Sequence, residues 1–163
     1  MEDQGSVTAN GTPGRVLVVD DVAVVRRSIR MILANAGYVV AEAANGAEAI
    51  ETLQASEGPR PVDAILSDIR MPRIGGVELI VHFLTCYPAI PVVSLTTYQD
   101  VELAVSLMRK GAMDFLVKPV LQDELLAVIG RAVGQNAALN DPIVSYKELR
   151  QGAENQLGKR VGG

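Results

Sequence analysis

The strongest constraint on the fold is an alternation along the chain of short apolar runs with longer segments of helical period. The apolar runs are residues 16–19, 38–41, 64–66, 91–95 and 115–117. Between them, apolar residues recur at the spacing of one helix face. Regular strand and helix alternation favours a parallel sheet with right-handed crossovers and helices on both faces. The sequence therefore predicts a doubly wound α/β fold with five strands and five helices.

The length of the chain limits the number of domains. With 163 residues, of which 48% are hydrophobic, the chain has enough apolar material for one core of ordinary size but not for two. We expect a disordered leader at residues 1–14, because this segment is polar and lacks apolar periodicity. The folded domain is predicted at 15–134. Residues 135–163 are expected to form the end of the last helix and then a linker or short helical tail.

Charge and cysteine content exclude several kinds of partner and compartment. The formal net charge of -4 gives no basic field of the sort that holds nucleic acid, so no direct nucleic-acid contact is expected. Cys86 is the only cysteine, so no internal disulfide can form, and the N-terminal residues lack the apolar stretch of a signal peptide. No run approaches the roughly 20 apolar residues of a membrane span. These features predict a cytoplasmic protein without direct membrane contact.

Polar residues stand where four of the predicted strands end. Asp20 and Asp21 follow the first strand, and Asp68 closes the third. The fourth strand ends in Thr96 and Thr97, and Lys118 follows the fifth. In doubly wound sheets the ligand crevice lies beyond the carboxyl ends of the strands. We therefore expect these side chains to converge in one crevice.

Converging carboxylates need a positive partner, because uncompensated they repel and raise one another's pKa. A helix N-cap would account for only one of Asp20 and Asp21. A divalent cation and Lys118 are both candidates for the positive charge, and Mg²⁺ suits a set of hard oxygen ligands. Asp68 beside such a metal would be able to attack a phosphoryl group. Lys118 and the Thr96 hydroxyl would then bind the phosphoryl oxygens.

Four motifs together carry a specific resemblance. The pair DD at residues 20–21, then SDIRMP, LTTY and DFLVKP occur in this order and at comparable intervals. They resemble the receiver domain of bacterial two-component response regulators over about residues 15–134. Each motif is weak by itself, because strands ending in Asp or Thr are common. The four motifs together, in this order, are specific for the resemblance.

The resemblance implies a mechanism and a topology. The strand order would be 2-1-3-4-5, as in the flavodoxin-like folds. Asp68 would accept phosphate from a histidine kinase or phosphotransfer protein. It also implies a cis peptide bond between Lys118 and Pro119. Mg²⁺, with Mn²⁺ as a substitute, would be held by Asp20, Asp21, Asp68 and the backbone carbonyl of Arg70.

The resemblance also implies a conformational switch. In the family a threonine, here Thr96, moves toward the phosphoryl group and an aromatic residue, here Phe115, turns inward. The surface of the fourth helix, fifth strand and fifth helix then changes, and a partner or a second copy can recognise it. On the fourth helix Val101, Ala104, Val105 and Met108 form one predicted stripe. Leu103 and Leu107 are expected to project from the opposite side, as an interface.

Three residues beside the motifs are expected to tune the chemistry. Thr97 occupies a position where the family usually has Ala or Gly, so its bulk predicts slower phosphotransfer. Arg70 and Tyr98 occupy positions that influence the access of water to the aspartyl phosphate. We expect a fairly long-lived phosphoryl state.

Other polar residues are assigned no chemistry. His82 is expected to face solvent, and Cys86 is expected to be a small packed residue. Arg26, Arg27 and Arg30 form a basic face on the first helix. That face is either simply solvated or a docking surface for the kinase, and the sequence leaves both readings open.

Two other functions compete with a phosphoacceptor. One is a receiver fold kept as an unphosphorylated scaffold, which the complete set of site residues argues against. The other is a haloacid-dehalogenase-type phosphatase, whose first strand should end in D-x-D. Here the residue two beyond Asp20 is Val22, so the acid/base partner is missing. The favoured reading is a signalling module that catalyses its own phosphorylation and dephosphorylation and is not a metabolic enzyme.

Overall fold

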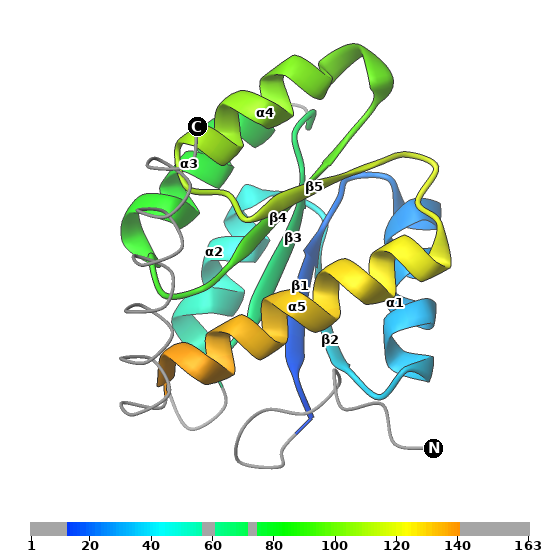
Figure 1. Ribbon diagram of the computed structural model, residues 1–163, viewed down its shortest axis with the longest axis vertical. Coiled ribbons are helices and arrows are strands. Elements are labelled where there is room, and N and C mark those ends of the chain that lie inside the picture. Colours follow the sequence, from blue (N-terminus) through cyan, green and yellow to red (C-terminus); the bar gives the residue numbers. More distant parts are fainter. Residues whose placement is uncertain (1–12, 57–60, 72–74, 141–163) are drawn as a thin grey trace, which may run out of the picture.

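The computed structural model describes residues 13–56, 61–71 and 75–140, with side chains described as far as residue 134 (Figure 1). Strands and helices alternate throughout these ranges. The strands are β1 (Arg15–Val19), β2 (Val39–Ala43), β3 (Ala64–Asp68), β4 (Val92–Thr96) and β5 (Asp114–Val117). The helices are α1 (Ala23–Asn35), α2 (Gly46–Ala55), α3 (Gly76–Cys86), α4 (Val101–Arg109) and α5 (Gln122–Asn140), with a 3-10 turn η2 (Tyr98–Asp100) before α4.

The strands form one parallel sheet in the order β2-β1-β3-β4-β5. This arrangement confirms the predicted doubly wound α/β fold and its flavodoxin-like order. Helices α1 and α5 lie on one face of the sheet, and α2, α3 and α4 lie on the other (Figure 1).

The side chains of β1 show how one short strand serves both faces. Val16 and Val18 belong to the core under α1 and α5, whereas Leu17 and Val19 belong to the core under α2, α3 and α4. Successive side chains of a strand point to opposite faces, so a strand covered on both sides reads as a continuous apolar run. This is why the four residues after Arg15, VLVV, are all apolar.

Local sequence signals explain several of the element ends. Asn45 caps α2, because its side chain accepts a hydrogen bond from the Glu48 backbone N–H at 2.9 Å. The Glu48 carboxylate in turn accepts from the Ala44 N–H at 2.7 Å, which satisfies a second donor at this helix end. Gly37 follows α1 with a φ of 101°, the left-handed conformation that ends helices.

The orientation of α4 differs from the predicted one. Leu107 is fully buried with Ala104, and Leu103 packs partly buried against the same core, whereas Met108 is exposed. The prediction that Leu107 projects away from the core is therefore wrong. The helix is rotated so that Ala104 and Leu107 face the core, where burial of the Leu107 side chain removes apolar area from water.

The predicted ends of the domain are only partly within the described residues. Gly14, assigned to the disordered leader, is buried, and its carbonyl accepts a hydrogen bond from the Val39 N–H at 2.9 Å. Ordered pairing thus begins before Arg15. Residues 1–12 of the leader and the tail from residue 141 lie outside the described residues. Among the helices described, none is long and apolar enough to cross a membrane.

Candidate functional site

Polar side chains from neighbouring strands meet at the carboxyl edge of the sheet. Asp68 is the last residue of β3, between β1 and β4 in the sheet. Asp20 and Asp21 directly follow β1, and Thr96 ends β4. The parallel register brings these strand ends to the same edge, as the sequence predicts.

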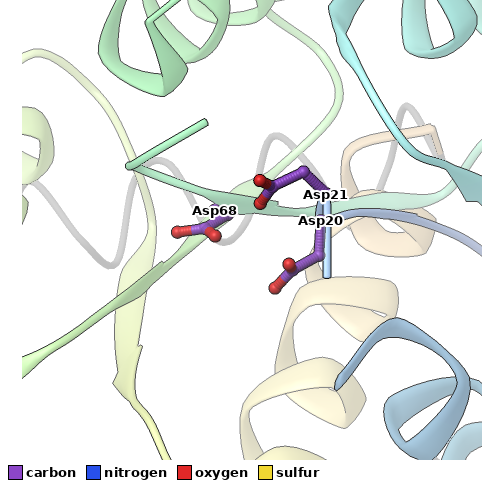
Figure 2. A group of neighbouring side chains, drawn as sticks. All are labelled: Asp20, Asp21 and Asp68. Atoms are coloured by element: carbon purple, nitrogen blue, oxygen red, sulfur yellow. The ribbon is translucent and has the colours of Figure 1, made fainter. Parts of the chain in front are cut away.

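The three aspartates are close enough to share one ion. One carboxylate oxygen from each of Asp20, Asp21 and Asp68 lies within 4.8 Å of the others. Figure 2 shows the three side chains coming from two neighbouring strand ends. Asp20 and Asp68 are buried, whereas Asp21 is exposed and forms the solvent side of the cluster. We call these three residues the acidic cluster.

Lys118 supplies a positive charge inside the acidic cluster. Its Nζ lies 2.8 Å from Asp20 Oδ2 and 2.9 Å from Asp68 Oδ2. The lysine side chain is mostly buried, so these ion pairs are shielded from water and salt. The peptide bond between Lys118 and Pro119 is cis, as the resemblance implied.

The pKa values of the site reflect burial and this ion pairing. Burial raises the pKa of Asp68 above the usual value of a carboxyl group, and hydrogen bonds from Lys118 and the Arg70 N–H offset only part of the effect. Burial acts to lower the pKa of Lys118, but hydrogen bonds to Asp20 and Asp68 outweigh it, so the net shift of the lysine pKa is upward. Lys118 therefore carries its charge at neutral pH.

Hydrogen bonds hold the two buried carboxylates in place. The Val22 N–H donates to Asp20 Oδ1 at 2.8 Å, and the Arg70 N–H donates to Asp68 Oδ1 at 3.1 Å. Each carboxylate thus accepts a backbone hydrogen bond at Oδ1 and forms an ion pair with Lys118 at Oδ2. Asp20 is not the N-cap of α1, because Val22 occupies that position without a side-chain hydrogen bond.

Arg26 supports the site, although the sequence places it on the basic face. Its guanidinium donates to the Asp20 carbonyl oxygen at 2.7 Å and to Glu42 Oε1 at 3.1 Å. The Arg26 side chain is only 14% exposed, whereas that of Arg30 is 54% exposed. The reading of Arg26 as a solvated residue is wrong. Its partner Glu42, on β2, could not be inferred from helical spacing.

Gly76 allows the chain after β3 to pass close to the start of α3. A Cβ atom at this position would lie 2.2 Å from the Ile69 carbonyl oxygen and 2.3 Å from that of Asp68. No real Cβ atom tolerates such contacts. A glycine at residue 76 is therefore required for the backbone that presents Asp68 and Arg70.

The remaining predicted site residues lie at the end of β4, just after it, and in β5. Thr96 is buried and its hydroxyl donates to the Thr97 carbonyl oxygen at 3.1 Å. Thr97 is exposed, and Tyr98 is 81% exposed. Phe115 is half-buried and packs against the core under α4.

Residues of α3 that were assigned no chemistry also have defined places. His82 is partly exposed, and its ring meets those of Phe83 and Tyr87 edge-on. Cys86 is exposed, with Sγ 3.6 Å from His82 Nδ1. The prediction of a packed cysteine is wrong, because position 86 falls in the last turn of α3, beyond the part that meets the core.

The site and the fold define a class of signalling protein, and comparison with known proteins identifies the family. Residues 16–130 match the family model for the response regulator receiver domain. The chain belongs to this family. This membership also excludes the dehalogenase-type phosphatase that the sequence left as an alternative.

Curated relatives are longer proteins that contain a similar segment. The chain is 39% identical over 137 residues to the DNA-binding transcriptional regulator NtrC of Escherichia coli K12 and 34% identical over 128 residues to the transcriptional regulatory protein ZraR of Klebsiella oxytoca. The two matches include 79% and 78% of this chain. The chain spans 28% of the length of each relative.

Solved structures of receiver domains have the same architecture. The receiver domain of NtrX from Brucella abortus matches with a TM-score of 0.67 and 31% identity, over 72% of this chain and 97% of that domain. The chemotaxis protein CheY4 of Vibrio cholerae matches with a TM-score of 0.65 and 33% identity, over 73% of this chain and 98% of that one.

Proposed function

We propose that Asp68 is the phosphoacceptor of this receiver domain and takes its phosphoryl group from a histidine kinase or a phosphotransfer protein. The observation that carries the proposal is the sharing of Lys118 by Asp68 and Asp20, with Asp21 on their open side. An acceptor needs a carboxylate at the crevice, a cation for the phosphoryl oxygens and an acidic pair for a metal. All three surround Asp68.

The acidic cluster suits Mg²⁺, and Mn²⁺ is a chemically similar substitute. Three carboxylate oxygens within 4.8 Å of one another are hard ligands of the kind that Mg²⁺ prefers. We assign the metal to Asp20, Asp21, Asp68 and the backbone carbonyl of Arg70. The bound ion would neutralise charge on the phosphoryl oxygens.

The transfer step follows from the position of Asp68. One carboxylate oxygen of Asp68 forms a bond to phosphorus while the P–N bond of the phosphohistidine donor breaks. The electron pair of that bond returns to the imidazole. Lys118 stabilises the negative charge of the transferred phosphoryl group, because its Nζ already lies 2.9 Å from Asp68 Oδ2. Hydrolysis by water returns Asp68 to its carboxylate, so the chain catalyses both phosphorylation and dephosphorylation of itself.

The switch that follows phosphorylation involves Thr96 and Phe115. The Thr96 hydroxyl donates to the adjacent Thr97 carbonyl, a weak local bond that a phosphoryl oxygen would replace. The Phe115 side chain is half-buried, and we infer that its ring turns inward as Thr96 moves. This motion alters the surface of α4, β5 and α5, through which we infer partner binding or a homodimer. Leu103 belongs to that surface in part, but the buried Leu107 does not contribute contact area.

The proposed partners are proteins. NtrC is a DNA-binding transcriptional regulator, but this chain spans 28% of its length, and its net charge of -4 gives no overall basic field to attract nucleic acid. We therefore infer that the receiver itself contacts neither nucleic acid nor membrane directly. A cytoplasmic location fits a histidine kinase as donor.

Intact mass measured after incubation with Mg²⁺ and acetyl phosphate tests the proposal. We expect an adduct of one phosphoryl group in the wild type and none in Asp68→Asn, which keeps the shape of the side chain. A folded wild-type protein that gains no adduct would favour the scaffold function instead. Size measured in the same samples reports whether phosphorylation produces a dimer. A decay lasting many minutes after donor removal is expected from the long-lived state.

A further inference from the structure

Two segments on the open side of the acidic cluster are joined by one pair of side chains. Arg70 Nε donates to Asp100 Oδ2 at 2.9 Å, and the terminal nitrogen Nη2 of Arg70 donates to Asp100 Oδ1 at 2.8 Å. Arg70 follows β3, and Asp100 is the last residue of η2 after β4, 30 positions later. Two parallel hydrogen bonds fix the orientation of a guanidinium group as well as its position.

Arg70 is held at both ends. Its backbone N–H donates to Asp68 Oδ1 at 3.1 Å, while its guanidinium is bound by Asp100. The Arg70 side chain is 71% exposed, and that of Asp100 is 16% exposed. An arginine this exposed would sample many rotamers without a partner. Asp100 therefore selects one position for a cation whose own backbone contacts the acceptor carboxylate.

The pair also changes the charge that an incoming donor meets. A phosphoryl donor is an anion, and it approaches a cluster of three carboxylates with one lysine among them. A free guanidinium would attract the donor and bind its oxygens through a planar fork of N–H groups. In the structure that fork is occupied by a fourth carboxylate, Asp100.

We propose that Asp100 is a positioning residue for phosphoryl transfer: it holds the Arg70 guanidinium by two hydrogen bonds and so keeps this cation from assisting the phosphoryl group. The proposal rests on the assignment of Asp68 as acceptor. Asp100 lies outside the four motifs. Its ion pair with Arg70, which we call the rim ion pair because it lies at the exposed edge of the site, would limit the rate of phosphorylation. Arg70 is the group that acts, and Asp100 acts through it.

A double-mutant cycle tests the proposal. The initial rate of phosphorylation by acetyl phosphate with Mg²⁺ is measured by intact mass for wild type, Asp100→Asn, Arg70→Met and the double variant. We expect Asp100→Asn to react about threefold faster than wild type, a factor in the range of surface ion-pair energies. The acceleration should vanish in the Arg70→Met background and shrink at high salt.

A charge-matched control separates this mechanism from a general electrostatic effect. Glu51 is exposed on α2, and Glu51→Gln removes the same charge as Asp100→Asn. We expect Glu51→Gln to react at the wild-type rate. Equal acceleration by Asp100→Asn in both Arg70 backgrounds, or no acceleration at all, would overturn the positioning role while the wild-type adduct still supports Asp68 as acceptor. Absence of the wild-type adduct would instead remove the proposed function itself.

Discussion

The ion pairs inside the site and the one on its rim have nearly the same length but very different surroundings. Lys118 lies 2.8 and 2.9 Å from Asp20 and Asp68, and its partners are almost completely buried. Arg70 and Asp100 approach to 2.8 Å, yet the arginine is largely in water. The energy of an ion pair depends strongly on the effective dielectric around it. Distance alone therefore does not rank these interactions.

The comparison separates two roles for charge around one acceptor. Inside the site, removing a partner leaves a buried charge uncompensated, which destabilises the fold. On the rim, water replaces a lost partner at little cost, so such a pair affects where a side chain lies more than whether the protein is folded. Substitutions at four positions test this separation.

Substitution of Lys118 tests the ion pairs inside the site. Lys118→Met leaves Asp20 and Asp68 without their shared cation, so we expect the free energy of unfolding to fall by about 2 kcal/mol, less than for a fully buried pair because the lysine touches solvent. Urea denaturation measures this change. Added Mg²⁺ should restore part of the stability by binding the acidic cluster. Unchanged stability would mean that interior and rim pairs do not differ as proposed.

Substitution of two adjacent glycines tests the close approach between the start of α3 and the backbone that follows β3. Gly76→Ala places a Cβ against the carbonyl oxygens of Asp68 and Ile69, so we expect a loss of about 2 kcal/mol of stability and slower phosphorylation. Gly75→Ala is the matched control, since a Cβ there meets nothing within 4 Å. Thermal unfolding of both variants gives the comparison. Equal effects at the two positions would contradict the close approach at Gly76.

Substitution of Thr97 tests an exposed residue of the site that has no charge. Its side chain is exposed, and the family resemblance predicts that its bulk slows the approach of the donor. Thr97→Ala removes that bulk. We expect phosphorylation by acetyl phosphate to become about threefold faster, because access and alignment of the donor improve. Stability should not change. A rate equal to that of the wild type would show that this side chain does not obstruct the donor.

Substitution of Asp100 gives the smallest expected effect on stability. Asp100→Asn breaks an exposed ion pair, so its urea midpoint should coincide with that of the wild type at physiological salt. The same samples should differ in phosphorylation rate. A marked loss of stability would place Asp100 with the interior residues and end the distinction between the two sets of charges.

Local patterns in the sequence were enough to predict the strands, the helices and the edge of the sheet at which the site lies. Apolar runs and helical periods are local properties, so the positions of the strands followed from them within a few residues. Asp20, Asp21, Asp68, Thr96 and Lys118 could be expected at one edge because parallel strands end together. The predicted strand order depended on the resemblance, and the sheet has that order.

The contacts of individual side chains depend on the packing of elements that are far apart in the chain. The rotation of α4 depends on which neighbours its leucines reach, so Leu107 is buried where the sequence placed it outside. Arg26 meets Glu42 on β2, and Arg70 meets Asp100 after β4, through contacts that no local pattern encodes. Periodicity specifies a face of one element. The partner of that face is set by packing between elements far apart in the chain. The contacts of Arg26 and Arg70 therefore could not be predicted, whereas the five residues at the strand ends could, because their positions follow from where the strands end.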